Sequence, residues 1–131
     1  MRVLAIDYGT ARCGCAISDP TGQLARPLPV IEPPEPRAIA EIVAEHEVEL
    51  VVVGMPFSLS GEEGPQAILT LEFCRELERH LDVPLVTYDE RLTTRMAAQT
   101  ERQGASAAED SLAAAHLLEG FLASRAGEGE G

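Results

Sequence analysis

The sequence contains no lysine and no tryptophan, and only 4% of its residues are aromatic. All ten basic residues are therefore arginines, and they stand against 22 acidic residues, which gives a formal net charge of −12. A protein of this charge repels polyanions at long range. Taken alone, the composition argues against a nucleic-acid partner.

Long apolar runs are missing as well. The run before Asp7 is too short for a secretory signal peptide, and the densest apolar stretch, residues 50–53, is far too short to span a membrane. The three cysteines form no Cys-x-x-Cys pair and lie within apolar patterns, so we expect buried, inert thiols. These features predict a cytoplasmic protein with no membrane partner.

The 131 residues are instead divided into short apolar segments. Extended segments come first, at 2–6, 13–18 and 24–31, and the prolines of the third place it at a sheet edge or outside regular pairing. Helices and strands then alternate, with helices opening at 33–36 and at Pro65, strands over 50–53 and 85–88, and closing helices over about 92–103 and 107–124.

This order predicts an α/β fold with a mixed five-stranded sheet, antiparallel in its first three strands and parallel in the later ones. The chain has the length of one domain. We expect that domain to cover residues 1–124 and to be followed by a disordered acidic Gly/Glu tail over 125–131.

Most acidic residues lie on the predicted helix surfaces, but a few do not. Asp7 ends the first strand, and the pair Asp89-Glu90 follows the fifth strand. In α/β sheets the carboxyl ends of strands are where ligands bind. Strand alternation puts Glu90 on one face with Tyr88, which separates it from Asp89 without deciding between the two.

Asp110 lies in the predicted last helix. Ser106 and Glu109 fit a capping box there, which gives Glu109 a structural role. At about 100° per residue, Asp110 falls on the apolar stripe of this helix, where an ionised carboxylate is costly without a positive partner. Either the helix dipole explains it, or a divalent cation shared with Asp7 and Glu90 does. Carboxylates without His or Cys ligands favour Mg²⁺ or Mn²⁺.

A site of this kind suits the cleavage of phosphodiester bonds. Two divalent ions about 4 Å apart activate water and stabilise the leaving oxygen in phosphodiester cleavage. We expect Asp7 to bridge both ions, with Glu90 and Asp110 each completing one site. Because the carboxylates repel one another without metal, Asp110→Asn is expected to abolish cleavage and to raise the metal-free stability.

Four segments of the chain resemble the motifs of the YqgF/RuvX family. They are Asp7 to Asp19, Val52 to Pro56 followed by Gly61, Asp89 to Thr94, and Asp110 to Ala115 with Leu117 and Leu118. The resemblance covers the chain except its tail. It implies a ribonuclease H-like fold close to that of RuvC-type Holliday junction resolvases. It also implies a hydrolase acting on ester bonds, a cytoplasmic nuclease that matures the 5′ end of 16S rRNA from its precursor, with branched-DNA resolution as the older alternative.

The family's pattern assigns metal binding and catalysis to the three carboxylates already singled out. It assigns phosphate contacts to Arg12, Arg91 and Arg95, and Thr10 is either a further phosphate donor or a turn cap. Residues 104–109 depart from the pattern, because family members commonly carry Lys or Arg there and this chain has none.

Two other functions share some of these features. The Asp-x-Gly-Thr turn also occurs in the phosphate loops of actin- and Hsp70-type ATPases, but those proteins need two such domains to enclose a nucleotide. A non-catalytic nucleic-acid-binding assembly factor is the second alternative. The sequence leaves open whether the protein is a monomer or a homodimer.

The negative charge is unevenly distributed. Residues 32–49 hold six Glu and one Arg, whereas residues 91–108 hold three Arg and one Glu. The composition therefore permits a nucleic-acid partner, with precursor rRNA favoured and branched DNA as the alternative. We expect weak, salt-sensitive and metal-dependent binding at an arginine-lined face.

Overall fold

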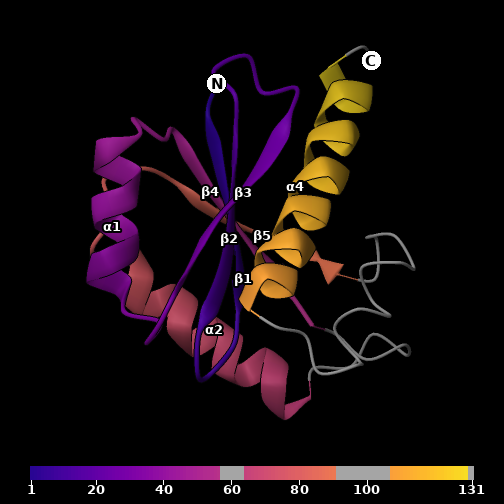
Figure 1. The fold of residues 1–131 in the computed structure, drawn as a ribbon. Helices are drawn as coiled ribbons and strands as arrows, with labels where there is room; N and C mark the ends of the chain where they lie inside the picture. The colour runs from indigo at the N-terminus through magenta and orange to yellow at the C-terminus, as the bar shows by residue number, and fades with distance from the viewer. Residues whose placement is uncertain (57–63, 91–106, 130–131) are drawn as a thin grey trace.

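In the computed structural model, the described residues are 1–56, 64–90 and 107–129. They form a five-stranded sheet and three helices (Figure 1). The strands are β1 (Val3–Tyr8), β2 (Cys13–Ser18), β3 (Ala25–Ile31), β4 (Leu50–Met55) and β5 (Leu85–Asp89), and the helices are α1 (Pro36–Glu45), α2 (Pro65–Glu78) and α4 (Ala107–Gly129).

The sheet has the predicted mixed topology, with the strand order β3-β2-β1-β4-β5. The pairs β1–β2 and β2–β3 are antiparallel, and the pairs β1–β4 and β4–β5 are parallel. Strand β3 lies at an edge, which is one of the two placements that its prolines allowed, because proline has no N–H to donate to a neighbour. Every residue of β4 is buried, as its continuous apolar run predicted.

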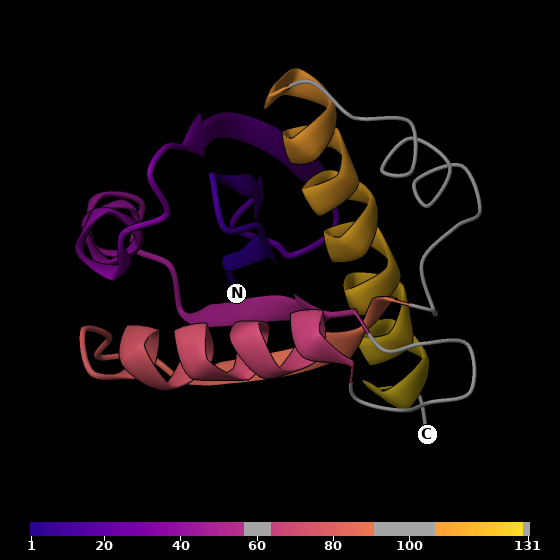
Figure 2. The same ribbon diagram turned by 90° about the horizontal axis from the view of Figure 1, so that it is seen from below.

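Helices cover both faces of the sheet. In Figure 1, α4 lies on one side of the strands and α1 on the other, and Figure 2 shows α2 alongside β4. Strand β1 divides its side chains between the two layers, with Leu4 and Ile6 in the core beneath α1 and α2, and Val3 and Ala5 in the core beneath α4. The face on which a strand residue lies therefore decides which helix it meets.

Helix α4 buries the stripe that its periodicity predicted. Ala113, Ala114, Leu117 and Phe121 are all buried on the sheet. The buried surface is wider than one stripe and includes Ala115, Leu118 and Ser111, because α4 lies across β1, β2 and β3. On the opposite side Glu119 is exposed and His116 is half-buried.

The carboxyl end of α4 differs from the expectation. The tail predicted as disordered from residue 125 is helical through residue 129. The guanidinium carbon of Arg125 lies 5.7 Å from the ring centroid of Phe121, one turn back, and this cation–π contact favours continuing the helix. The helix predicted over 92–103 and Ser106, the N-cap of the predicted capping box, lie outside the described residues.

The remaining expectations concern the cysteines and the membrane. Cys13, Cys15 and Cys74 are free and buried, as predicted. Burial raises the pKa of Cys13 and of Cys15 to about 12, and that of Cys74 to about 11, so all three stay protonated at neutral pH. Among the described helices, none is both long enough and apolar enough to cross a lipid bilayer.

Candidate functional site

The candidate site lies where β1 and β4 end and β2 begins, on the face covered by α4. Asp7 is half-buried near the end of β1. Side chains of a strand alternate between faces, so Asp7 shares the α4 face with Val3 and Ala5. Neighbouring strands are about 4.8 Å apart, so the residues beside Asp7 on β2 and β4 decide what approaches its carboxylate.

On one side of Asp7 stands Gly14 of β2, its direct partner in the antiparallel register. A Cβ at Gly14 would lie 2.1 Å from the carbonyl oxygen of Asp110. The first turns of α4 therefore rest directly on the backbone of β2, an approach that any larger residue would block. A hydrogen bond of 3.5 Å from the Cys15 N–H to the Ser111 Oγ fixes the same contact. These contacts hold the main chain of Asp110 beside Asp7.

On the other side of Asp7 stands Gly54 of β4. The β1–β4 register runs through the pair Ile6 and Val53, and Asp7 and Gly54 are the next residue of each strand. A Cβ at Gly54 would lie 2.7 Å from the Glu90 Oε1. The Glu90 carboxylate therefore lies over the space that this glycine leaves.

The same face distinguishes the two acidic residues after β5. Tyr88 packs in the core beneath α4, and a Cβ at Gly54 would lie 3.1 Å from Leu117 of α4. Glu90 is therefore on the α4 side, and alternation directs Asp89 to the opposite side. The structure brings Asp7, Glu90 and Asp110 to one face at one end of the sheet, with a glycine on each side of Asp7.

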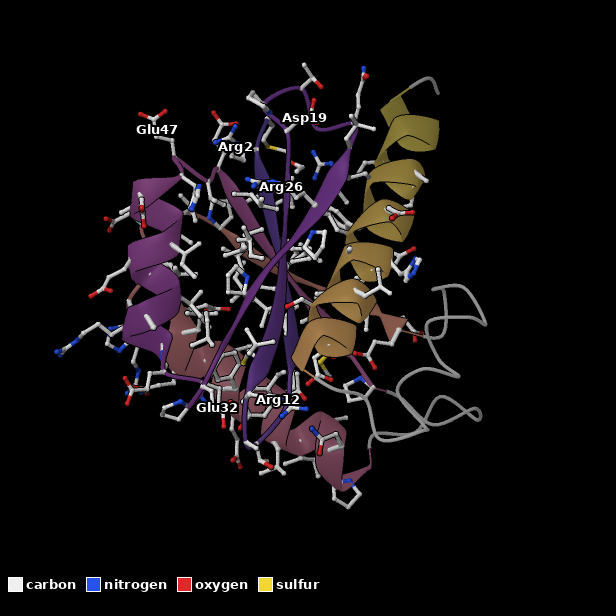
Figure 3. All side chains as sticks on the ribbon, in the orientation of Figure 1. Arg2, Arg12, Asp19, Arg26, Glu32 and Glu47 are labelled. Carbon is white, nitrogen blue, oxygen red and sulfur yellow. The ribbon has the colours of Figure 1, made fainter. Side chains whose placement is uncertain are left out.

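Asp110 has a cationic partner that the sequence did not predict. The Arg12 Nε donates a hydrogen bond to the Asp110 Oδ2 at 2.5 Å, although 98 positions separate the two residues. Figure 3 shows Arg12 at the end of the sheet where α4 begins. The hydrogen bond to Asp110 and its negative charge, together with the charge of Glu32, raise the pKa of Arg12 above its ordinary value. Arg12 is therefore a permanent cation at this site.

The other predicted contact residues are less fully described. Thr10 is exposed in the turn between β1 and β2, the turn that also carries Arg12. It therefore lies at the same end of the sheet as the three carboxylates. Arg91 and Arg95 lie outside the described residues.

Hard-cation chemistry suits the donor set, since carboxylate oxygens are the ligands that Mg²⁺ and Mn²⁺ prefer. In the described part of the chain, however, no three His, Cys, Asp or Glu side chains lie close enough together to hold one metal ion. The Asp110 carboxylate is turned to Arg12 instead. The three residues thus fit a divalent cation by type and lie at one end of the sheet, but their side chains are not gathered around one point.

Sequence reasoning missed the two glycines and the ion pair. Gly14 and Gly54 stand within the motif segments, and their role follows only from the register, which puts both beside Asp7. The signal that finds them is a glycine inside an otherwise apolar strand, which often marks the close approach of another chain segment. No local pattern links Arg12 to Asp110.

Comparison with known proteins agrees with this architecture. Residues 1–124 match the model of the RuvX family, described as "Holliday junction resolvase". A protein of Desulforudis audaxviator (strain MP104C) named "Putative pre-16S rRNA nuclease" is 39% identical over 135 residues, covering 95% of this chain and 96% of that protein. A protein of the same name from Roseiflexus sp. (strain RS-1) is 38% identical, with 95% of each chain covered.

A solved structure shares the fold. It is titled "T. thermophilus RuvC in complex with Holliday junction substrate", and it superposes with a TM-score of 0.62 and 17% identity over 97% of this chain and 96% of that one. This likeness identifies the fold as that of the RuvC-like resolvases, in agreement with the expected ribonuclease H-like sheet. The family match over residues 1–124 shows that the chain belongs to the RuvX family.

Proposed function

We propose that this protein is a divalent-metal-dependent nuclease that cleaves precursor 16S rRNA during maturation of its 5′ end, in the cytoplasm. The observation that carries the proposal is the placement of Asp7 between two glycines. One of them admits the main chain of Asp110 and the other admits the carboxylate of Glu90. Asp7, Glu90 and the main chain of Asp110 thus lie at one end of one face of the sheet, which supports a shared role for the three residues.

In this proposal Asp7, Glu90 and Asp110 hold the metal, as two ions of Mg²⁺ or Mn²⁺. Bound ions of this kind supply an activated water and neutralise charge on the leaving oxygen of a phosphodiester. The protein's own contribution is rigid placement. Buried β1 fixes Asp7, and the β2–α4 contact fixes the main chain of Asp110.

Substrate positioning falls to residues of the β1–β2 turn and of the segment after β5. The Arg12 guanidinium is suited to hold a non-reacting phosphate oxygen, because its planar fork can donate two hydrogen bonds. Thr10, on the same turn, is a further donor. Arg91 and Arg95 complete the phosphate contacts in this proposal.

The names of the relatives support RNA as the substrate. Proteins 38–39% identical over nearly their whole length are named for pre-16S rRNA. The family description names Holliday junctions instead, so a four-way DNA junction is the second candidate substrate.

Parallel cleavage assays test the proposal. The full chain is incubated with a precursor 16S rRNA fragment spanning the 5′ cleavage site and with a four-way DNA junction, each in Mg²⁺, Mn²⁺ or EDTA. We expect metal-dependent cleavage of the RNA near the mature 5′ end and slower cleavage of the junction. Preferential cleavage of the junction assigns the protein to DNA, and equal cleavage in EDTA contradicts the metal-dependent mechanism.

A further inference from the structure

The Asp110 carboxylate, which the proposed function assigns to a metal ion, is paired with Arg12 in the structure. The pair is short, 2.5 Å between the Arg12 Nε and the Asp110 Oδ2. Its side chains are only partly shielded, with 31% of the Arg12 side chain and 25% of the Asp110 side chain exposed. Solvent therefore reaches both partners, and either side chain can move without opening the core.

The backbone of Asp110 is held in place by its contact with β2. The main chain at Asp110 rests on Gly14, and Ser111 accepts a hydrogen bond from β2. Arg12 stands in the turn between β1 and β2, and its long side chain reaches Asp110 from outside the helix. An exchange of partners at Asp110 therefore requires movement of the Arg12 side chain and leaves α4 in place.

A guanidinium and a divalent cation do not share one carboxylate at low cost. Both are positive, and two cations held a few ångströms apart repel strongly where water is partly excluded. Without metal, the same guanidinium offsets the charge of Asp110 beside the other carboxylates. Arg12 thus supplies, within the chain, the positive charge that a metal ion would otherwise bring.

We propose that Arg12 is the metal-free counter-ion of Asp110, that metal binding displaces it, and that the displaced guanidinium then binds a substrate phosphate. This inference rests on the proposed function for its metal site and adds a coupling between metal loading and substrate binding. By thermodynamic linkage, the coupling works in both directions, so a phosphate that binds Arg12 also raises the affinity of the site for the metal ion.

Titration calorimetry of the full chain with MnCl₂ and with MgCl₂ tests the first step. Arg12→Gln removes the competing charge, so we expect it to bind the metal about tenfold more tightly or better than the native chain. Arg26→Gln is the matched control, because it removes the same charge from an exposed position on neighbouring β3, away from Arg12 (Figure 3). Its metal affinity is expected to equal that of the native chain.

The outcomes separate the inference from the proposed function. Equal metal affinity in the native chain and in Arg12→Gln overturns the displacement while leaving the metal site standing. Equal tightening in Arg26→Gln also overturns it, because net charge then explains the effect. If neither the native chain nor Arg12→Gln binds metal, both the metal site and the inference fail.

Two measurements do not depend on a metal-affinity comparison. In ¹⁵N–¹H spectra of the native chain, we expect the Arg12 Nε–H signal to shift on Mg²⁺ addition, and an unchanged signal at saturation overturns displacement. With a single-stranded RNA, the salt dependence of binding in Ca²⁺ is expected to be steeper for the native chain than for Arg12→Gln by about 0.7 in log–log slope, which corresponds to one phosphate contact. Equal slopes in Ca²⁺ overturn the second step.

Discussion

Replacing Gly14 by alanine is the sharpest structural perturbation of the site. The new Cβ would lie 2.1 Å from the carbonyl oxygen and 2.5 Å from the carbonyl carbon of Asp110, both of them backbone atoms that no rotamer change removes. Ordinary contact begins near 3.4 Å, so the start of α4 must retreat from β2 by about 1 Å. Overpacking of this kind costs about 1–3 kcal/mol of unfolding free energy.

The same movement carries the Asp110 carboxylate away from Asp7. Because a misplacement of about 1 Å can cost about 100-fold in rate, we expect Gly14→Ala to lose about 100-fold in cleavage while remaining folded. Urea denaturation measures the stability, and cleavage of the precursor rRNA fragment measures the rate.

Gly64→Ala is the control for this substitution. Among the described residues, nothing lies within 4 Å of a Cβ at Gly64, which caps α2. The unfolding free energy of Gly64→Ala should therefore differ from that of the native chain by no more than about 1 kcal/mol, and its cleavage rate should be unchanged. If Gly14→Ala is as stable as this control and cleaves at the native rate, the β2–α4 contact does not position Asp110.

Three further predictions test separate features. Gly54→Ala meets the movable Glu90 carboxylate, so it should weaken Mn²⁺ binding by about tenfold in titration calorimetry; native affinity would contradict the role of the gap. Burial raises the pKa of the Cys13 and Cys15 thiols to about 12, so mass spectrometry should detect no iodoacetamide adduct on either residue of the folded chain at pH 8. The free energy of unfolding should also fall above about pH 9, because only the unfolded chain releases these protons there. Asp19 accepts two backbone N–H bonds that lower its pKa, so Asp19→Asn should lower the Tm at pH 7. The difference in Tm between the variant and the native chain should shrink as the pH falls below about 4, and a difference that stays constant with pH would refute this role of the Asp19 charge.

The ion pair changes one expectation drawn from the sequence. Repulsion among the carboxylates predicted that Asp110→Asn raises the metal-free stability. In the structure Asp110 accepts a charge-assisted hydrogen bond from Arg12. Removing its charge therefore costs this bond, and the expected change in metal-free stability is a loss.

Local patterns predicted most of the fold. Prolines limited β3 to an edge or to a place outside regular pairing, a continuous apolar run marked β4 as fully buried, and helical periodicity selected the face of α4 that packs on the sheet. These features succeed because each depends on a residue and its near neighbours in sequence. The predicted carboxyl end of α4, at residue 124, was wrong by five residues. The cation–π contact of Arg125 with Phe121, one turn back, favours a helix where the composition resembles a disordered tail.

Details of the site depend on contacts across the whole chain. The Arg12–Asp110 pair spans 98 positions, and the Gly14 contact with Asp110 spans nearly as many. Such contacts exist only once β2 pairs with β1 and α4 covers both. The sequence therefore pointed to acidic residues that lie at one end of the sheet, but not to the glycines beside Asp7 or to the arginine that pairs with Asp110.

The most direct test of the account compares cleavage of the precursor 16S rRNA fragment by the native chain, Asp7→Asn and Asp82→Asn in Mg²⁺ and in Mn²⁺. Asp82 is exposed and precedes β5, whereas Asp7 lies near the end of β1. The account predicts that Asp7→Asn loses at least about 100-fold in rate while Asp82→Asn cleaves like the native chain. Cleavage by Asp7→Asn at the native rate would contradict a nuclease built on these carboxylates.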